Sequence, residues 1–392
     1  MSARAKGDPV PLLSDLIACP SVTPAEAGVF DVLEAVLEPL GFATTRVVFE
    51  GDGSYPVGNL FAIRGTGGKR LLFAGHTDVV PPGDMGDWTR PPFAPEIRDG
   101  RIFGRGAADM KSGIAAFVAA VEAAIADGSA DQGTIALAIT NDEEADAVNG
   151  TEKLIAWARA QGHEFDFAIV GEPSATATVG DSIKVGRRGS LNGQIVVTGL
   201  QGHVAYPDKA NNPLPVVAGL VTALSRTPID EGTEHFPRSN LEVTSIDVGN
   251  QTTNVIPARG TIRFNIRFND LWTPESLGDW IAGRIASVEA KGCEIAFSRV
   301  GRPSRSFLSP LGGGVETLAG VIEAATGSRP QLSTGGGTSD ARFIASYCPV
   351  VEFGLPGATM HKADENVLVA DVRQLADLYA RFIAAWFVSG ND

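Results

Sequence analysis

Three short apolar runs of the chain each end in a histidine or in acidic residues. Short runs of this kind are typical of buried strands, and the catalytic groups of open α/β sheets collect beyond the carboxyl ends of the strands. We therefore expect the side chains after these runs to meet in one site. The runs are 71–75, 134–140 and 166–170, and the residues after them are His76, Asp78, Glu143, Glu144 and Glu172.

Two more residues of suitable chemistry lie elsewhere in the chain. Asp109 stands in the glycine-rich segment 104–113, just before a predicted helix, and His361 follows the last predicted strand. Taken singly, Asp109 is equally well explained as a helix N-cap, and Glu143 with Glu144 as a solvated acidic loop. Taken together, two histidines and several carboxylates suit zinc at a hydrolytic site. Two such ions lie about 3.5–4 Å apart in aminopeptidase-like hydrolases, and Asp109 could bridge them.

The elements that must position these residues follow an alternating pattern. From about residue 10 to 185, helical and strand patterns alternate, which predicts an α/β layered domain. From about 190 to 300, four strand patterns and two helical patterns predict a compact α+β unit with a four-stranded antiparallel sheet. The α/β pattern returns after about 300. We therefore expect a catalytic domain in two parts, 1–188 and 303–392, with an inserted domain at 189–302.

Composition excludes several classes of protein. The net charge of −14, from 46 acidic and 32 basic residues, argues against nucleic acid as the main partner. No apolar run reaches the ~18 residues of a membrane span, and the first 20 residues lack the apolar core of a secretion signal. The three cysteines are far apart and form no C-x-x-C pair. We expect a protein of the reducing cytoplasm, with no nucleic-acid or membrane partner.

Several motifs together resemble one family. Their order is that of the di-zinc deacylase and aminopeptidase superfamily, and within it the chain resembles the bacterial desuccinylases of diaminopimelate synthesis. The resemblance runs from about residue 10 to 388. It rests on His76 to Pro81, Gly104 to Gly113, Asp142 to Glu144, Gly171 to Pro173, Met360 to Lys362, Cys19 to Pro24, Val185 to Ser190, Gln201 to Pro207, Asn254 to Pro257 and Ser333 to Phe343.

The resemblance implies a role for each candidate residue. His76 and Glu172 are expected on one zinc, Glu144 and His361 on the other, and Asp109 between them. Two Zn²⁺ per subunit are implied, for which Co²⁺ can substitute. Glu143 is expected to be the general base and Asp78 to orient His76. The resemblance also implies a homodimer through the inserted domain, in which His203 of one subunit stabilises the oxyanion in its partner.

The implied reaction is hydrolysis of N-succinyl-LL-2,6-diaminopimelate to succinate and LL-2,6-diaminopimelate, a step of lysine and cell-wall precursor synthesis. The alternative is an acetylornithine deacetylase or another N-acyl-amino-acid deacylase. A substrate with several carboxylates needs cations, and guanidinium groups bind carboxylates in bidentate fashion. The run Gly335–Gly337 suggests a backbone-lined carboxylate pocket, although the arginines suit a solvated surface equally well. The expected substrate-binding residues are Arg187, Arg188, Asn254, Arg267, Gly336, Thr338 and Ser339.

Overall fold

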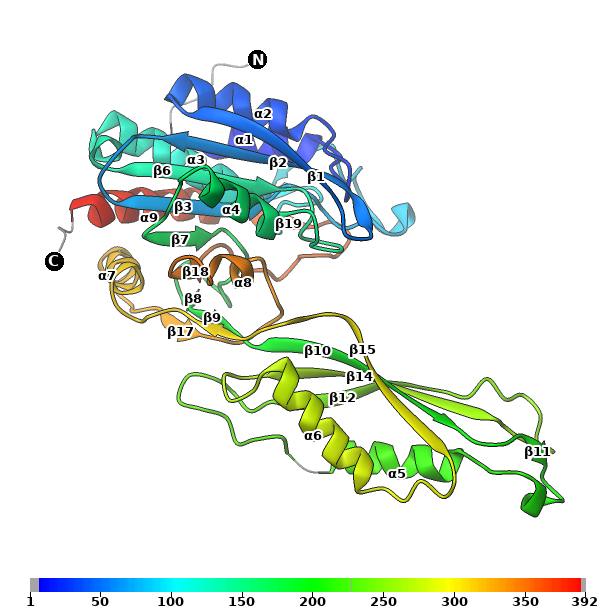
Figure 1. Ribbon diagram of the computed structural model, residues 1–392. Helices are drawn as coiled ribbons and strands as arrows, with labels where there is room; N and C mark the ends of the chain where they lie inside the picture. The colour runs from blue at the N-terminus through cyan, green and yellow to red at the C-terminus, as the bar shows by residue number, and fades with distance from the viewer. Residues whose placement is uncertain (1–6, 227, 389–392) are drawn as a thin grey trace. The chain divides into compact units, whose positions relative to one another are not determined.

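The computed structural model describes residues 7–226 and 228–388 and divides into two compact units (Figure 1). The first unit contains the residues up to Val185, Ser309–Ser333, and the residues from Ser339 onward. The second contains Gly186–Leu308 and Thr334–Thr338. The sequence boundaries at 188 and 302 lie a few residues from these limits, and the short segment 334–338 joins the second unit, although it lies within the predicted second part of the catalytic domain.

The first unit is built on an eight-stranded mixed sheet with strand order β1-β2-β6-β3-β7-β18-β8-β17. A three-stranded sheet, β19-β5-β4, accompanies it. The strands of the two sheets are β1 (Ala43–Gly51), β2 (Ser54–Arg64), β3 (Arg70–His76), β4 (Glu96–Arg98), β5 (Arg101–Phe103), β6 (Thr134–Thr140), β7 (Phe167–Val170), β8 (Ser182–Lys184), β17 (Gln331–Ser333), β18 (Val350–Glu352) and β19 (Asn366–Leu368).

Helices cover both faces of the eight-stranded sheet. Phe73 of β3 stacks on Phe117 of α3 and meets Tyr379 of α9 edge-on, whereas Phe61 of β2 meets Trp157 of α4. Strand register puts Phe61 and Phe73 on opposite faces, because side chains alternate along a strand. The helices are α1 (Val10–Ala18), α2 (Val29–Leu37), α3 (Lys111–Ala126), α4 (Thr151–Ala160), α7 (Gly314–Thr326), α8 (Ala341–Ile344) and α9 (Val369–Val388), with short 3₁₀ turns at Glu38–Leu40, Met85–Asp87 and Ser129–Gln132.

The three apolar runs are strands at the centre of this sheet. Strands β6, β3 and β7 are neighbours and parallel, and almost every residue in them is buried. A strand buried on both faces has a continuous apolar sequence, as a parallel sheet covered by helices requires. The predicted strands are confirmed, and their carboxyl ends meet at one edge of the sheet.

The second unit is the predicted α+β arrangement. The four strands of its main sheet are antiparallel in the order β12-β14-β10-β15, and α5 and α6 lie on one side of them (Figure 1). The alternating residues Ile262, Phe264, Ile266 and Phe268 of β14 belong to the core. The elements are β9 (Gly186–Arg187), β10 (Gly189–Thr198), β11 (Gly202–His203), α5 (Leu214–Ser225), β12 (Asn240–Asp247), β13 (Val255–Ile256), β14 (Arg259–Phe268), α6 (Pro274–Ala286), β15 (Glu294–Ser304) and β16 (Phe307–Leu308), with a 3₁₀ turn at Pro207–Lys209.

Within the described residues, no helix has both the length and the apolar character needed to cross a bilayer.

Candidate metal centre and active site

Strand ends and two loops bring the five proposed ligands together in the first unit. His76 is the last residue of β3, and Glu172 follows β7 by two residues. Glu144 lies in the loop after β6. Asp109 lies between β5 and α3, and His361 between β18 and β19. Because β3, β6 and β7 are adjacent and parallel, their following residues share one edge of the sheet.

The ligand atoms form two groups that share one residue. His76, Asp109 and Glu172 each offer one atom within 4.8 Å of the others, and so do Asp109, Glu144 and His361. Oδ1 of Asp109 lies 3.3 Å from Nε2 of His76, and Oδ2 lies 3.3 Å from Nε2 of His361. The two oxygens of one carboxylate therefore face two different imidazoles, which is the geometry of a bridging ligand.

His76 is held with its Nε2 atom toward this group. Its Nδ1 atom lies 2.9 Å from the backbone carbonyl oxygen of Asp78. A carbonyl accepts only, so Nδ1 carries a proton, and Nε2 is the nitrogen that can bind a metal once its own proton is lost. The predicted partner, the carboxylate of Asp78, is farther away, with Oδ1 at 3.6 Å from Nδ1. Asp78 thus orients His76 first through its main chain.

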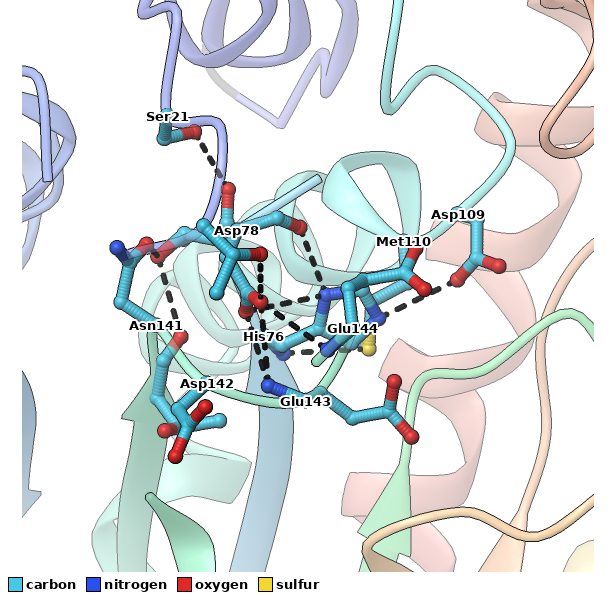
Figure 2. A network of polar contacts seen from close by, with 12 residues as sticks. Ser21, His76, Asp78, Asp109, Met110, Asn141, Asp142, Glu143 and Glu144 are labelled. Carbon is cyan, nitrogen blue, oxygen red and sulfur yellow. Dashed lines mark hydrogen bonds and ion pairs between the residues drawn. The ribbon is translucent and has the colours of Figure 1, made fainter. Parts of the chain in front are cut away.

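The carboxylate of Asp78 holds the loop of the two adjacent glutamates (Figure 2). The backbone N–H of Glu143 donates to both carboxylate oxygens at 3.2 Å, and that of Glu144 donates to Oδ2 at 3.1 Å. The hydroxyl of Thr23 donates to the same oxygen at 2.7 Å. One buried side chain therefore fixes the backbone that carries the proposed base and one proposed ligand.

The two glutamates differ in their surroundings. Oε1 of Glu144 lies 3.1 Å from Nε2 of His361, whereas Glu143 belongs to neither group of ligand atoms found in the described part of the chain. Burial raises the pKa of Glu143 well above its usual value, and the nearby carboxylates of Asp340 and Glu144 add to this effect. A carboxylate with a raised pKa is suited to accept and return a proton near neutral pH.

The other charges of the site perturb one another strongly. Burial opposes the charged form of His76, but its hydrogen bond to Asp109 and the charge of Glu172 hold its pKa well above the usual value. Hydrogen bonds to Asp109 and Glu144 raise the pKa of His361 to about 10. Burial works against ionisation of Asp109, yet its contacts with both histidines lower its pKa. Burial and Asp109 raise the pKa of Glu172.

Met110 packs beneath the first group of ligands. It is fully buried, and a Cβ atom placed on Gly75 or Gly171 would lie 2.5 or 2.8 Å from its terminal methyl group. Both glycines therefore leave room for this side chain. Their next residues in sequence are His76 and Glu172, and Met110 itself follows Asp109. Each of the three ligands of this group is thus next in sequence to one of the three residues that pack together, Gly75, Met110 or Gly171.

The donor set fits two divalent cations. Two imidazole nitrogens and three carboxylates are ligands that zinc accepts, and His76 has the correct tautomer. Two ions would carry four positive charges against three carboxylates. Without cations, the carboxylates of Asp109 and Glu172 repel each other, which adds to burial in raising the pKa of Glu172.

The proposed substrate-binding residues and His203 fall mainly in the second unit. The Nη1 atom of Arg187 donates to the carbonyl of Gly335 at 3.0 Å. Gly336 has φ = 106°, and a Cβ atom there would lie 2.2 Å from the same Nη1. Only glycine allows this close approach. Arg187 and the glycine run, which are 148 residues apart, are therefore neighbours.

Two other arginines lie close to each other in this unit. Burial lowers the pKa of Arg267, and the nearby charge of Arg188 lowers it further. Arg188 donates to Oδ1 of Asn240 at 2.9 Å. Two guanidinium groups at this spacing repel each other, and an anion between them would relieve the repulsion.

Asn254, Thr338 and Ser339 have different settings. Asn254 lies just before β13, and its carbonyl accepts the N–H of Val204. Thr338 is the last residue of the segment that joins the second unit. Ser339 is buried, and its hydroxyl donates to the carboxylate of Glu352. This contact gives no support to the prediction that Ser339 binds substrate.

Sequence reasoning passed over three residues that the structure places in the site. Thr23 bonds Asp78, Met110 supports the first ligand group, and Asp340 lies near Glu143. Asp340 is buried, which raises its pKa to about 6. Thr23 and Asp340 both occur in segments that carried the resemblance, but nothing in the spacing distinguished them from their neighbours.

Comparison with known proteins identifies the family of the chain. The model of peptidase family M20/M25/M40 matches residues 72–385. The chain belongs to the M20 family. A succinyl-diaminopimelate desuccinylase of Rhodospirillum centenum is 53% identical over 384 residues, which cover 98% of each chain. One of Methylocella silvestris is 50% identical over 379 residues, covering 96% of this chain and 98% of the relative.

Solved M20 structures share the fold at low sequence identity. A metallo-carboxypeptidase of Sulfolobus solfataricus has a TM-score of 0.75 at 16% identity and covers 97% of this chain and 99% of its own. A dinuclear metal-binding M20 peptidase of Bacillus subtilis has a TM-score of 0.67 at 14% identity, with 96% of both chains covered. The predicted fold class is confirmed: a mixed α/β M20 fold with a small antiparallel sheet in a second unit.

Proposed function

We propose that the chain is a metal-dependent amide hydrolase that converts N-succinyl-LL-2,6-diaminopimelate and water to succinate and LL-2,6-diaminopimelate. This is a step in the synthesis of lysine and of cell-wall precursors. The substrate rests on two relatives of that activity that are at least 50% identical over nearly the whole chain. The observation that carries the chemistry is the Asp109 carboxylate, whose two oxygens face His76 and His361.

The metals are proposed to be two Zn²⁺ ions per subunit, with Co²⁺ as a substitute. His76 and Glu172 would hold one ion, Glu144 and His361 the other, and Asp109 both. When bound, the ions would polarise the amide carbonyl and lower the pKa of a water molecule. The loop that Asp78 fixes supports this assignment, because it separates the side chains of Glu143 and Glu144.

Glu143 is the proposed general base. It takes a proton from the attacking water as the new C–O bond forms, and later gives that proton to the leaving amine as the amide C–N bond breaks. Its raised pKa supports this role, because a protonated Glu143 can act as an acid near neutral pH. The fixed backbone N–H of Glu143 supports it also, because a base must be held within reach of the proton.

His203 is proposed to bind the developing oxyanion in the partner of a homodimer formed through the second unit. Its Nδ1 atom accepts the N–H of Ala205 at 3.1 Å. The proton of a neutral imidazole is therefore on Nε2, which is left to donate. A preorganised donor of this kind acts where negative charge develops in the transition state.

The carboxylates of the substrate are proposed to bind Arg187, Arg188 and Arg267 with the backbone of Gly336 and the side chains of Asn254 and Thr338. The contact between Arg187 and the glycine run, and the proximity of Arg188 to Arg267, support an anion site. The predicted cytoplasmic location agrees with three buried, unbridged cysteines.

Hydrolysis of N-succinyl-LL-2,6-diaminopimelate should be compared with that of N-acetylornithine, each with and without added Zn²⁺. We expect metal-dependent turnover of the succinyl substrate, and a kcat/KM that exceeds that for the acetyl substrate. A preference for N-acetylornithine would favour the alternative deacylase. Full activity after complete removal of metal would refute the metal centre itself.

A further inference from the structure

Two loops of the first unit carry two of the proposed ligands, neither of which lies in or directly after a strand. Asp109 lies in the loop between β5 and α3, and His361 in the loop between β18 and β19. His361 has φ = 61°, in the left-handed region that a non-glycine residue rarely adopts. Such a conformation persists only when surrounding contacts impose it. Contacts must therefore hold the loop of His361.

The carboxylate of Glu365 contacts both loops. Its Oε1 atom accepts the backbone N–H groups of Ala108 at 2.7 Å and of Asp109 at 3.1 Å. Its Oε2 atom accepts the backbone N–H of Gly106 at 3.0 Å and Nη1 of Arg105 at 2.7 Å. Glu365 is only 1% exposed, and it is four residues beyond His361. A side chain on the loop of His361 thus accepts the backbone N–H groups of the loop that carries Asp109.

Arg105 completes the connection in the opposite direction. Its Nη1 atom also donates to the carbonyl of Lys362 at 3.1 Å, next to His361. The backbone N–H of Gly104 donates to the carbonyl of Glu365 at 2.9 Å. Trp88 covers the guanidinium, with its ring centre 5.1 Å away. The contacts between the two loops are therefore buried and reciprocal.

This arrangement requires a carboxylate. Four donors converge on the two oxygens of Glu365, so both oxygens must accept. In Glu365→Gln, one position becomes an NH₂ group, which would face N–H donors at hydrogen-bond distance. General stability does not explain the ion pair, because a buried pair of charges often contributes little net stability.

We propose that Glu365 is a positioning residue for the metal centre. It fixes the backbone of the shared ligand Asp109 relative to the loop of His361, and so sets the affinity for the ion held by Asp109, Glu144 and His361. The inference rests on the proposed metal centre and assigns it a support that acts through backbone geometry. Groups that orient metal ligands typically change metal affinity by about 10–100-fold when removed.

The test is metal binding by the full-length chain, measured by competition between the protein and a chelator for Zn²⁺ and by metal analysis after dialysis. Glu365→Gln should weaken Zn²⁺ binding at the group of Asp109, Glu144 and His361 by roughly 10-fold or more. Arg105→Lys keeps the charge but loses the guanidinium fork, and it should produce a smaller loss of the same kind. It serves as a second variant if Glu365→Gln does not fold.

Asp230→Asn is a matched control. Asp230 also accepts four donors, from the backbone of Gly232 and Ser239 and from the side chains of Asn269 and Trp272. It lies in the second unit, which contains none of the five proposed ligands. Asp230→Asn should lower the stability of the protein and leave Zn²⁺ affinity unchanged. A loss of affinity in both variants would mean that instability alone weakens metal binding, and would overturn the proposal.

A double-mutant cycle locates the effect. Glu365→Gln should weaken Zn²⁺ binding in a Glu172→Ala background, where the His361 side is intact. In a His361→Ala background, Glu365→Gln should cause little further loss of Zn²⁺ affinity, because the site formed with His361 is already lost. The positioning role is refuted if the wild-type chain binds two Zn²⁺ ions and Glu365→Gln binds both of them as tightly as the wild type does. If the wild-type chain binds no metal, the proposed metal centre fails instead.

Discussion

Asp78→Asn tests whether this carboxylate acts on His76 or on the glutamate loop. The side chain accepts from Thr23 and from the backbone of Glu143 and Glu144, but it lies 3.6 Å from Nδ1 of His76. An asparagine of the same shape can keep its oxygen at the Oδ2 position. Hydrogen bonds to a charged acceptor exceed those to a neutral one by about 1 kcal/mol each.

Three weakened hydrogen bonds therefore lower the free energy of unfolding by about 3 kcal/mol. Removal of a buried charge offsets part of this loss. Burial raises the pKa of Asp78, so some of the loss is returned. We expect a net decrease of about 2 kcal/mol in the free energy of unfolding. Metal affinity should fall by only about tenfold, which is the smallest effect usual for removal of a group that orients a metal ligand. The reason is that the backbone carbonyl of Asp78 still fixes the tautomer of His76.

The assay measures kcat with the metal sites saturated, Zn²⁺ affinity, and denaturant unfolding. Asp78→Asn should lower kcat even when saturated, because the backbone of Glu143 is released. Thr23→Val is the matched control, since it removes one hydrogen bond to the same carboxylate and keeps both backbone contacts. The reasoning is refuted if Asp78→Asn loses metal but has normal kcat once metal is restored, because the carboxylate would then act on His76.

Four further predictions concern the proposed base, one metal ligand and two residues of the second unit. Glu143→Ala should retain both metals and lose turnover by roughly 10²-fold or more, and the two glutamates are reversed if it is Glu144→Ala that keeps metal. Arg267→Ala should raise KM more than it lowers kcat, and unchanged kinetics would return Arg267 to a surface role. Mixed dimers of Glu143→Ala and His203→Ala should recover activity, whereas no recovery after verified subunit exchange would count against donation between subunits. In the metal-free chain, the raised pKa of His361, about 10, keeps its imidazole protonated at pH 7. Zn²⁺ binding should then release protons and strengthen as the pH rises toward 10, which calorimetry in buffers of different ionisation enthalpy detects; no proton release would contradict this.

The strands that position the site were predictable, and the outer strands were less so. Strands β3, β6 and β7 are buried on both faces, which leaves a continuous apolar signal in the sequence. Strand β1 is at the edge of the sheet, and none of its residues is fully buried. Its sequence therefore carries no clear apolar period, and no strand was predicted there.

The contacts within the site could not be read from the sequence. The four donors to Glu365 lie 256–260 residues away along the chain, so no local spacing reveals them. The role of Asp78 illustrates another limit. Its position two residues after His76 predicted a side-chain contact, but the turn of the backbone brings the carbonyl closer. The residue types predicted a metal centre, whereas the backbone geometry determines which atom of Asp78 contacts His76.

The packing of Met110 against Gly75 and Gly171 makes the metal centre sensitive to side-chain volume. A thioether is flexible and fills irregular space, so the site depends on an apolar residue that can adjust its shape. A methyl group added at either glycine would press on Met110, which follows Asp109 in the sequence. Larger side chains at Gly75 and Gly171 are thus expected to weaken metal binding, although neither these glycines nor Met110 is a proposed ligand.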